Sequence, residues 1–151
     1  REKQRARRIY GVQERQFRRY FRNAQHVKGM TGVTLLVTLE RRLDNVVFRL
    51  GYATSRAEAR QLVKHGHFMI NGRKVKTPSL LVKPGWKLGL RESSKQVLRI
   101  TAALEALEGR SVPQWLEMDK ANMEGVIKQM PVREDVTLPI EEQLIVELYS
   151  R

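Results

Sequence analysis

The segment from residue 55 to residue 76 constrains the fold most, because its apolar pattern changes there from helical to extended. Ser55 and Glu58 form a Ser-x-x-Glu capping box, which marks a helix N-terminus, and Gly66 is expected to end that helix. Asn71-Gly72 then separates two short apolar runs and predicts a two-residue hairpin, since both turn residues need positive φ. A helix followed directly by a hairpin predicts an α+β fold.

Two helical patterns precede this segment. Residues 12–25 predict a helix with an aromatic face opposite a stripe of arginines. A break at residues 26–32 precedes a second helix, predicted as continuous from Leu35 to Leu50, with Gly51 in the C-terminal cap. The expected buried positions are Phe17, Tyr20, Phe21 and Ala24 in the first helix and Leu35, Leu36, Leu39, Leu43, Val46, Val47 and Leu50 in the second.

Strands and helices are both expected in the remainder of the chain. A turn at Lys83-Pro84-Gly85 precedes a predicted strand over residues 86–90, and a helix over residues 97–107 is expected to end near Gly109. Residues 112–118 and 126–130 are predicted as further strands. Pro139 followed by two acidic residues predicts the start of a last helix, because proline and acids are favoured in the first turn. The apolar side of that helix is expected to contain Leu144, Ile145, Leu148 and Tyr149.

The charge of the chain indicates a polyanionic partner. Lys and Arg number 29 against 16 Asp and Glu, which gives a net charge of +13. The excess is uneven, because residues 1–40 carry 10 basic and 3 acidic side chains, whereas residues 111–151 carry 4 and 8. We therefore expect a polyanion to bind the first two-thirds of the chain.

Catalytic and membrane functions find little support in the sequence. His65 and His67 lack a neighbouring carboxylate or cysteine that would complete a metal site, so a hydrogen-bonded or RNA-facing pair is favoured over metal ligands. Neither a glycine-rich phosphate loop nor a nucleophile–base set is present, and the chain contains no cysteine. No apolar run approaches the roughly 20 residues that cross a bilayer. We predict no catalytic residue, metal or cofactor.

Basic side chains recur at helical spacing on two of the predicted helices. Arg15, Arg18, Arg19 and Arg22 share one stripe, and Arg56, Arg60 and Lys64 form another. Guanidinium groups hold phosphate through paired hydrogen bonds and stack on unpaired bases, which favours structured RNA as the partner. The alternative for the first stripe is a solvated cationic face on a helix whose other side is buried.

Several motifs resemble the bacterial small-subunit ribosomal protein four family. Its RNA-binding module is matched by residues 41–47, 55–63, 65–67 and 70–72. Residues 7–12, 14–18 and 144–150 are similar to the family outside that module, so the resemblance covers essentially the whole chain. Thr77, Leu80 and Trp86 depart from the family pattern at positions that concern hairpin packing. The chain begins at Arg1 instead of methionine, and we expect that an N-terminal segment has been removed or omitted.

The resemblance implies both an architecture and a function. A helical domain would be built from residues 1–42 and 124–151, with an inserted RNA-binding module at residues 43–123 that combines a helix-turn-helix with a small, mainly antiparallel sheet. The protein would bind 16S rRNA directly at a five-way junction early in small-subunit assembly, in the ribosome of the cytoplasm. Ribosomal proteins three and five would lie nearby, where messenger RNA enters, and mRNA is a further candidate partner.

Two alternative functions are weighed against this one. The first is the RNA-binding module of an RNA-modifying enzyme of the pseudouridine-synthase kind, but neither flank is long enough for its catalytic domain. The second, a free-standing stress or rescue factor, would lack the matching terminal motifs.

The candidate RNA-binding residues come from both parts of the chain. They are Arg7, Arg8, Arg15, Arg18, Arg19, Arg22, Arg42, Asn45, Arg49, Ser55, Arg56, Arg60, Gln61, Lys64, His65, His67, Asn71, Arg73, Lys74 and Lys76.

Overall fold

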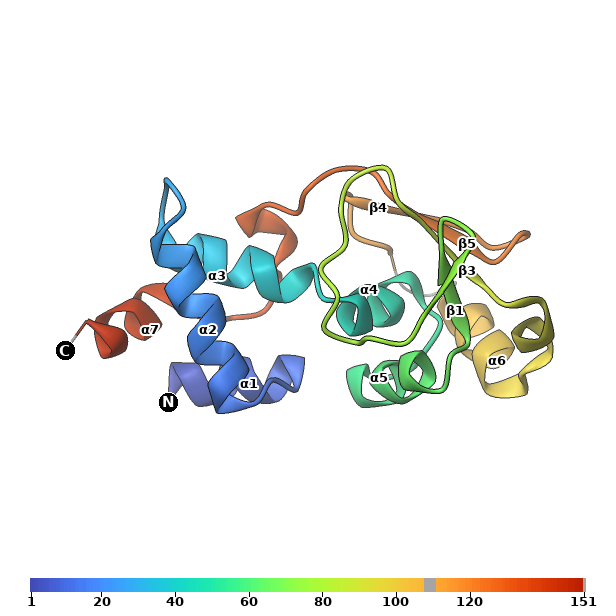
Figure 1. The fold of residues 1–151 in the computed structure, drawn as a ribbon, viewed down its shortest axis with the longest axis horizontal. Coiled ribbons are helices and arrows are strands. Elements are labelled where there is room, and N and C mark those ends of the chain that lie inside the picture. Colours follow the sequence, from blue (N-terminus) through green and yellow to red (C-terminus); the bar gives the residue numbers. More distant parts are fainter. Residues whose placement is uncertain (108–110, 151) are drawn as a thin grey trace. The chain divides into compact units, whose positions relative to one another are not determined.

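The computed structural model describes residues 1–107 and 111–150, which divide into two compact units. Unit 1 contains the described residues of Arg1–Glu40 and Pro131–Arg151, and unit 2 contains those of Arg41–Met130. Each unit buries its own hydrophobic core. Unit 1 therefore contains residues near both ends of the chain (Figure 1). The domain limits expected from the family resemblance stay a prediction, although the last strand of unit 2 lies beyond residue 123.

Unit 1 is helical, and its helices pack around aromatic and leucine side chains. Tyr10 donates a buried hydrogen bond from Oη to Glu40 Oε2 at 2.5 Å, which links its first and third helices. The rings of Phe21 and Tyr149 stack with centroids 4.4 Å apart. The first helix had no counterpart in the sequence analysis. The helical elements of unit 1 are α1 (Glu2–Tyr10), α2 (Glu14–Gln25), α3 (Thr31–Glu40), the short 3-10 helix η3 (Arg133–Asp135) and α7 (Glu142–Tyr149).

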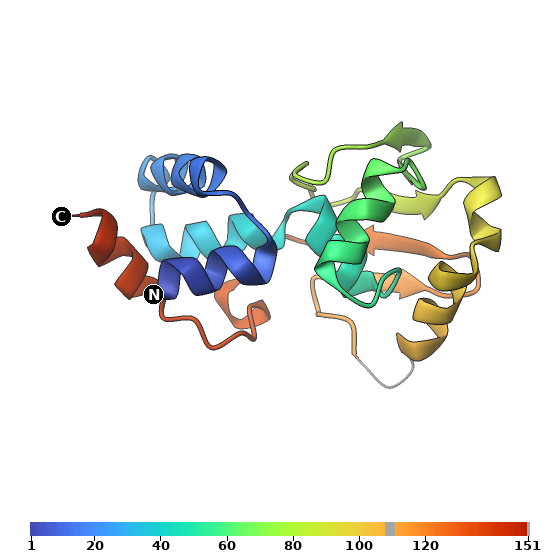
Figure 2. The same cartoon turned by 90° about the horizontal axis from the view of Figure 1, so that it is seen from below.

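Unit 2 is an α+β structure with helices on one face of an antiparallel sheet (Figures 1 and 2). Within the described residues its strands follow the order β2-β1-β3-β5-β4, and every neighbouring pair is antiparallel. Trp115, Tyr52 and Leu88 are fully buried between these layers. The elements of unit 2 are α4 (Leu43–Leu50), α5 (Arg56–Lys64), β1 (Phe68–Ile70), β2 (Arg73–Val75), β3 (Lys87–Leu90), η1 (Glu92–Gln96), α6 (Leu98–Ala106), β4 (Leu116–Asp119) and β5 (Glu124–Ile127).

The prediction of one continuous helix from Leu35 to Leu50 was wrong. The chain leaves the helical conformation at Arg42, with φ −60° and ψ 138°, which separates α3 from α4. A distant loop holds this break open, because Leu43 N donates to Leu80 O at 2.8 Å and Val82 N donates to Arg41 O at 3.0 Å. The apolar stripe continues across the break, but its first part is buried in unit 1 and its second part in unit 2.

The predicted hairpin is confirmed. Asn71 and Gly72 both have positive φ, 50° and 81°, and Ile70 lies opposite Arg73 in the pairing of β1 with β2. The strands predicted at residues 112–118 and 126–130 were misplaced, because β4 and β5 occupy residues 116–119 and 124–127. The predicted end of a helix near Gly109 lies outside the described residues.

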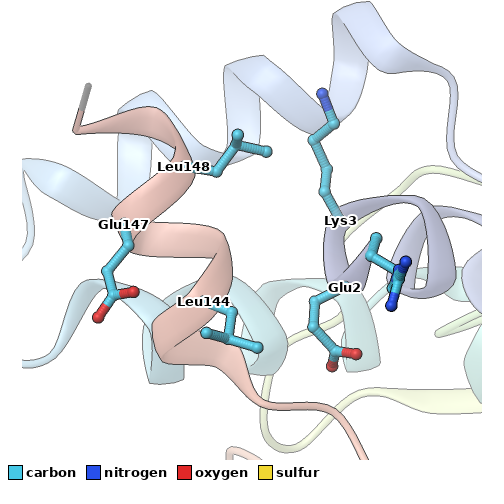
Figure 3. A pocket seen from close by; sticks show the side chains of 6 residues that line it. Glu2, Lys3, Leu144, Glu147 and Leu148 are labelled. Carbon is cyan, nitrogen blue, oxygen red and sulfur yellow. The ribbon is translucent and has the colours of Figure 1, made fainter.

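The last helix is present, but its apolar side is only partly buried. Ile145 is buried, whereas Leu144 and Leu148 are 46% and 40% exposed. These two leucines line a surface pocket together with residues of α1, among them Glu2 (Figure 3). The pocket also contains the carboxylates of Glu2 and Glu147 and the basic side chains of Arg1 and Lys3, so its lining charges balance. Among the helices of the described ranges, none combines the length and apolarity that a bilayer span requires.

Candidate nucleic-acid interface

The N-terminus of α5 is fixed by the predicted serine cap. Ser55 has an extended backbone and its Oγ accepts a hydrogen bond from Glu58 N at 3.1 Å. The Glu58 carboxylate accepts from Thr54 N at 2.9 Å, one residue before the position that a strict capping box would use. The Ser55 hydroxyl oxygen thus serves the helix as an acceptor. The cap positions α5 so that its basic side chains project from a rigid element.

Arg56 joins the two helices of the helix-turn-helix. Its Nε donates to Asn45 Oδ1 at 2.8 Å, and its guanidinium lies 4.7 Å from the ring centroid of Phe48. Asn45 is fully buried, so it orients Arg56 instead of presenting its own amide to a ligand. We therefore withdraw Asn45 from the candidate RNA contacts. Arg56 itself is partly buried and has a structural role besides any contact with RNA.

Arg42 is also withdrawn, because it is an internal side chain. Its guanidinium donates to both carboxylate oxygens of Asp44, Nη2 to Oδ2 at 2.9 Å and Nε to Oδ1 at 3.2 Å. Only 4% of the Arg42 side chain and 3% of the Asp44 side chain are exposed. This buried pair neutralises the arginine and closes the start of α4. Spacing alone placed Arg42 beside Asn45 and Arg49, but only Arg49 of those three reaches the surface, half-buried.

Two lysines of the hairpin, Lys74 and Lys76, lie near the turn that follows α5. Together with His67 and Arg91 they form what we call the Gly66 cluster. A Cβ at Gly66 would meet Lys74 Cε at 3.0 Å and Lys76 Cε at 3.1 Å, so both lysine stems cross this glycine. Arg91 Nη1 contacts the Gly66 carbonyl oxygen at 3.5 Å. The charges of Lys76 and Arg91 lower the pKa of the Lys74 amine. Like charges are thus held together at an exposed site, which favours an anionic ligand.

His67 is the titratable member of the Gly66 cluster. Its Nδ1 lies 2.8 Å from the Oγ of buried Ser94. Burial lowers the pKa of His67, and the charges of Arg99, His65 and Arg91 lower it further. Arg91 and Arg99 were absent from the predicted site. The signal that could have found Arg91 is its position directly after a predicted strand, where antiparallel pairing returns it to the start of β1.

The stability of the protein should depend on pH through His67. Its pKa in the folded chain lies below the ordinary value of about 6.5, so the folded state binds fewer protons than the unfolded state. The stability that the neutral His67 ring contributes is fully present above the pKa that His67 has in the unfolded chain. That stability is lost as the pH falls through the lower pKa that His67 has in the folded chain. We expect urea denaturation to show a smaller loss of stability between pH 7 and pH 5 in His67→Gln than in the wild type. Equal losses would contradict this assignment.

The other predicted residues of unit 2 occupy exposed or half-buried positions. Asn71 is exposed and its Oδ1 accepts from Lys87 N at 3.0 Å, which ties the hairpin turn to β3. Arg60 is half-buried and, like Arg49 and Arg56, has interactions within the protein. The structure places these side chains on consecutive elements, from α5 through the turn to the hairpin. The remaining predicted residues with exposed side chains are Gln61, Lys64, His65 and Arg73.

Arginines of unit 1 form the predicted stripe on α2, and a carboxylate adjoins it. Glu14 pairs with Arg18 at 3.4 Å, Lys3 at 3.1 Å and Arg7 at 3.1 Å. Arg7 is therefore partly neutralised. Glu14 precedes Arg18 by one helical turn and lies before the first arginine of the stripe. That both units contribute to a single RNA surface stays a prediction. The predicted contact residues of unit 1 with exposed side chains are Arg8, Arg15, Arg18, Arg19 and Arg22.

A basic helix-turn-helix and hairpin on an antiparallel sheet are typical of an RNA-binding protein. Two family models match the chain: the S4 domain over residues 41–85 and the ribosomal protein S4/S9 N-terminal domain over residues 1–40. The chain belongs to the small ribosomal subunit protein uS4 family. It is thus a ribosomal protein and not an enzyme.

Three curated relatives illustrate this membership, and each is a small ribosomal subunit protein uS4. The relative from Geobacter sp. (strain M21) is 62% identical over 151 residues, which cover all of this chain and 73% of the relative. The relatives from Geotalea daltonii and Anaeromyxobacter sp. (strain K) are each 60% identical with the same coverage. The identity extends through both units, so the expected resemblance is confirmed across the described fold.

Proposed function

We propose that this protein binds 16S rRNA directly at a multi-helix junction and helps to nucleate assembly of the small ribosomal subunit. The observation that carries the proposal is the Gly66 cluster, which adjoins the basic side of α5. Lys74, Lys76 and Arg91 stand together there, and their mutual repulsion is reflected in the lowered pKa of Lys74. Phosphates brought together by a junction would relieve that repulsion, whereas a neutral ligand would not.

The kind of contact favours RNA backbone over base sequence. Side chains of the candidate surface are cations and histidines on short, rigid elements, and they carry few of the amide groups that pair with base edges. Arg56 is held in place by Asn45 and Phe48, so its guanidinium is preorganised. Preorganised cations suit a folded RNA whose phosphates already have fixed positions. Small-subunit proteins three and five, and mRNA where it enters the subunit, are the proposed neighbours.

Chemical footprinting on full-length 16S rRNA tests the proposal. We expect protection to concentrate where several RNA helices meet, because the cationic side chains lie on several consecutive elements. Footprints in the presence of proteins three and five would then test the proposed neighbours. Protection spread evenly over the RNA, or none at salt concentrations near 150 mM, would argue against direct junction binding.

Removing the two hairpin lysines should weaken rRNA binding without unfolding the chain. Both lysines of the variant Lys74→Ala/Lys76→Ala are exposed and neither forms a salt bridge among those found in the described residues. Filter binding across a range of salt should show a slope of log K against log salt that is shallower by about 2, roughly 1 for each lost phosphate contact. Circular dichroism should be unchanged.

A charge-matched variant controls for the loss of net charge. Lys83→Ala/Lys128→Ala also removes two exposed lysines, but Lys83 precedes β3 and Lys128 follows β5, whereas Arg91 follows the other end of β3. We expect this variant to keep most of the wild-type slope. If both double variants lose the same slope, the Gly66 cluster has no special part in binding.

A further inference from the structure

The end of β3 brings His67 and Arg91 into direct apposition. Arg91 N donates to His67 O at 2.9 Å, next to the β1–β3 pair of Phe68 and Leu90. Two permanent cations directly opposite each other would destabilise an antiparallel ladder. A histidine avoids that cost because it can be neutral in the free protein and charged when an anion is present.

Buried Ser94 holds the histidine ring in either state. Its Oγ lies 2.8 Å from His67 Nδ1, and Ser94 is only 4% exposed. A hydroxyl can donate to a neutral ring nitrogen or accept from a protonated one, so this hydrogen bond survives protonation. The Ser94 position is itself fixed by its backbone, since Ser94 N donates to Arg91 O at 2.9 Å. The ring therefore keeps one orientation while its charge changes.

Among the described residues, the charged groups that act on His67 come from three parts of unit 2 and are all basic. Arg91 follows β3, Arg99 lies on α6 and His65 follows α5, and each of them lowers the pKa of His67. Glu92, the residue after Arg91, forms an ion pair with Lys95, in which Lys95 Nζ lies 3.1 Å from Glu92 Oε2. Arg99 is exposed. An anion at this position would meet two arginines and a histidine that gains charge on binding.

We propose that His67, Arg91 and Arg99 form a further RNA-phosphate contact, to which His67 binds in its protonated form. The inference rests on the proposed function, because it takes RNA as the ligand, but it extends the Gly66 cluster to Arg99 on α6 and adds the protonation of His67. Nδ1–H then donates to Ser94 Oγ, and Nε2–H is the remaining donor of the ring. Binding takes up a proton from solution, and by linkage a fall in pH strengthens binding.

Calorimetry of the full chain with the 5′ domain of 16S rRNA tests the proton uptake. Titrations near pH 6.5 in two buffers of different ionisation enthalpy give the number of protons bound with the RNA. We expect uptake of a fraction of a proton for the wild type, and an affinity that rises by up to about tenfold for each pH unit of acidification. His67→Gln should bind without that proton, and Arg99→Gln should bind with a shallower salt slope.

His26→Gln is the matched control, since it removes an exposed histidine of unit 1 that is not among the candidate contacts, and it should keep the proton uptake. Selective NMR of the histidine Cε1–H groups in the wild type provides a measurement that does not depend on variants, and the pKa of His67 should rise when RNA is added. Binding with no proton uptake, uptake that persists in His67→Gln, or an unchanged His67 titration would overturn the inference. If the RNA is not bound at any pH, the proposed function fails instead.

Discussion

Replacing Arg42 with alanine is expected to lower the free energy of unfolding by about 3–5 kcal/mol, because it strands a carboxylate in the protein interior. Asp44 is 3% exposed in its side chain and loses both hydrogen bonds from the guanidinium. One backbone hydrogen bond remains, from Asn45 N to Asp44 Oδ1 at 2.8 Å. A single donor does not replace the opposite charge. Urea denaturation followed by tryptophan fluorescence measures the loss.

Arg73→Ala is the matched control for this prediction. Arg73 lies on β2 with an exposed side chain, so its removal should change the free energy of unfolding by less than about 0.5 kcal/mol. The effects on RNA binding should be reversed. Arg73→Ala should weaken RNA binding more than Arg42→Ala does, because only Arg73 is a candidate contact. An Arg42→Ala protein that unfolds like the wild type but binds RNA weakly would show that Arg42 belongs to the binding surface after all.

Local sequence signals predicted the parts of the fold that depend on nearby residues. The serine cap of α5 and the positive φ of Asn71 and Gly72 involve residues within a few positions of each other, so their patterns are legible in the chain. The buried face of α2 also followed from spacing, since a helix with one apolar side buries that side.

Long-range contacts account for what the sequence analysis missed. The break between α3 and α4 depends on hydrogen bonds from residues near 80, about forty positions away, while the apolar spacing runs on without interruption. Arg42 lies at the same break, where its backbone pairs with Leu81 and its buried side chain pairs with Asp44. Arg91 joins the Gly66 cluster only through strand pairing. Charge spacing on single helices could not have located these contacts.

The division of one apolar stripe between two cores leads to a prediction about Leu43. This leucine is fully buried among residues of unit 2, and Leu43→Ala should lower the free energy of unfolding by about 2–5 kcal/mol, through lost burial and the cavity left behind. Both tryptophans of the chain, Trp86 and Trp115, lie in unit 2, so fluorescence reports on this unit. Urea denaturation followed by fluorescence should therefore detect the whole loss.

Leu36→Ala makes the same chemical change at an equally buried position in the core of unit 1. It should lower the unfolding midpoint measured by far-ultraviolet circular dichroism. It should leave the protection of the unit 2 amides against hydrogen exchange unchanged. Hydrogen exchange then separates the variants, because Leu43→Ala should expose the amides of α4 and β3 while Leu36→Ala exposes those of α2 and α3.

A loss below about 0.5 kcal/mol for Leu43→Ala would mean that its cavity collapses at no cost. Identical exchange patterns would mean that the two cores unfold as one, and the stripe would then behave as the single element that its spacing suggests.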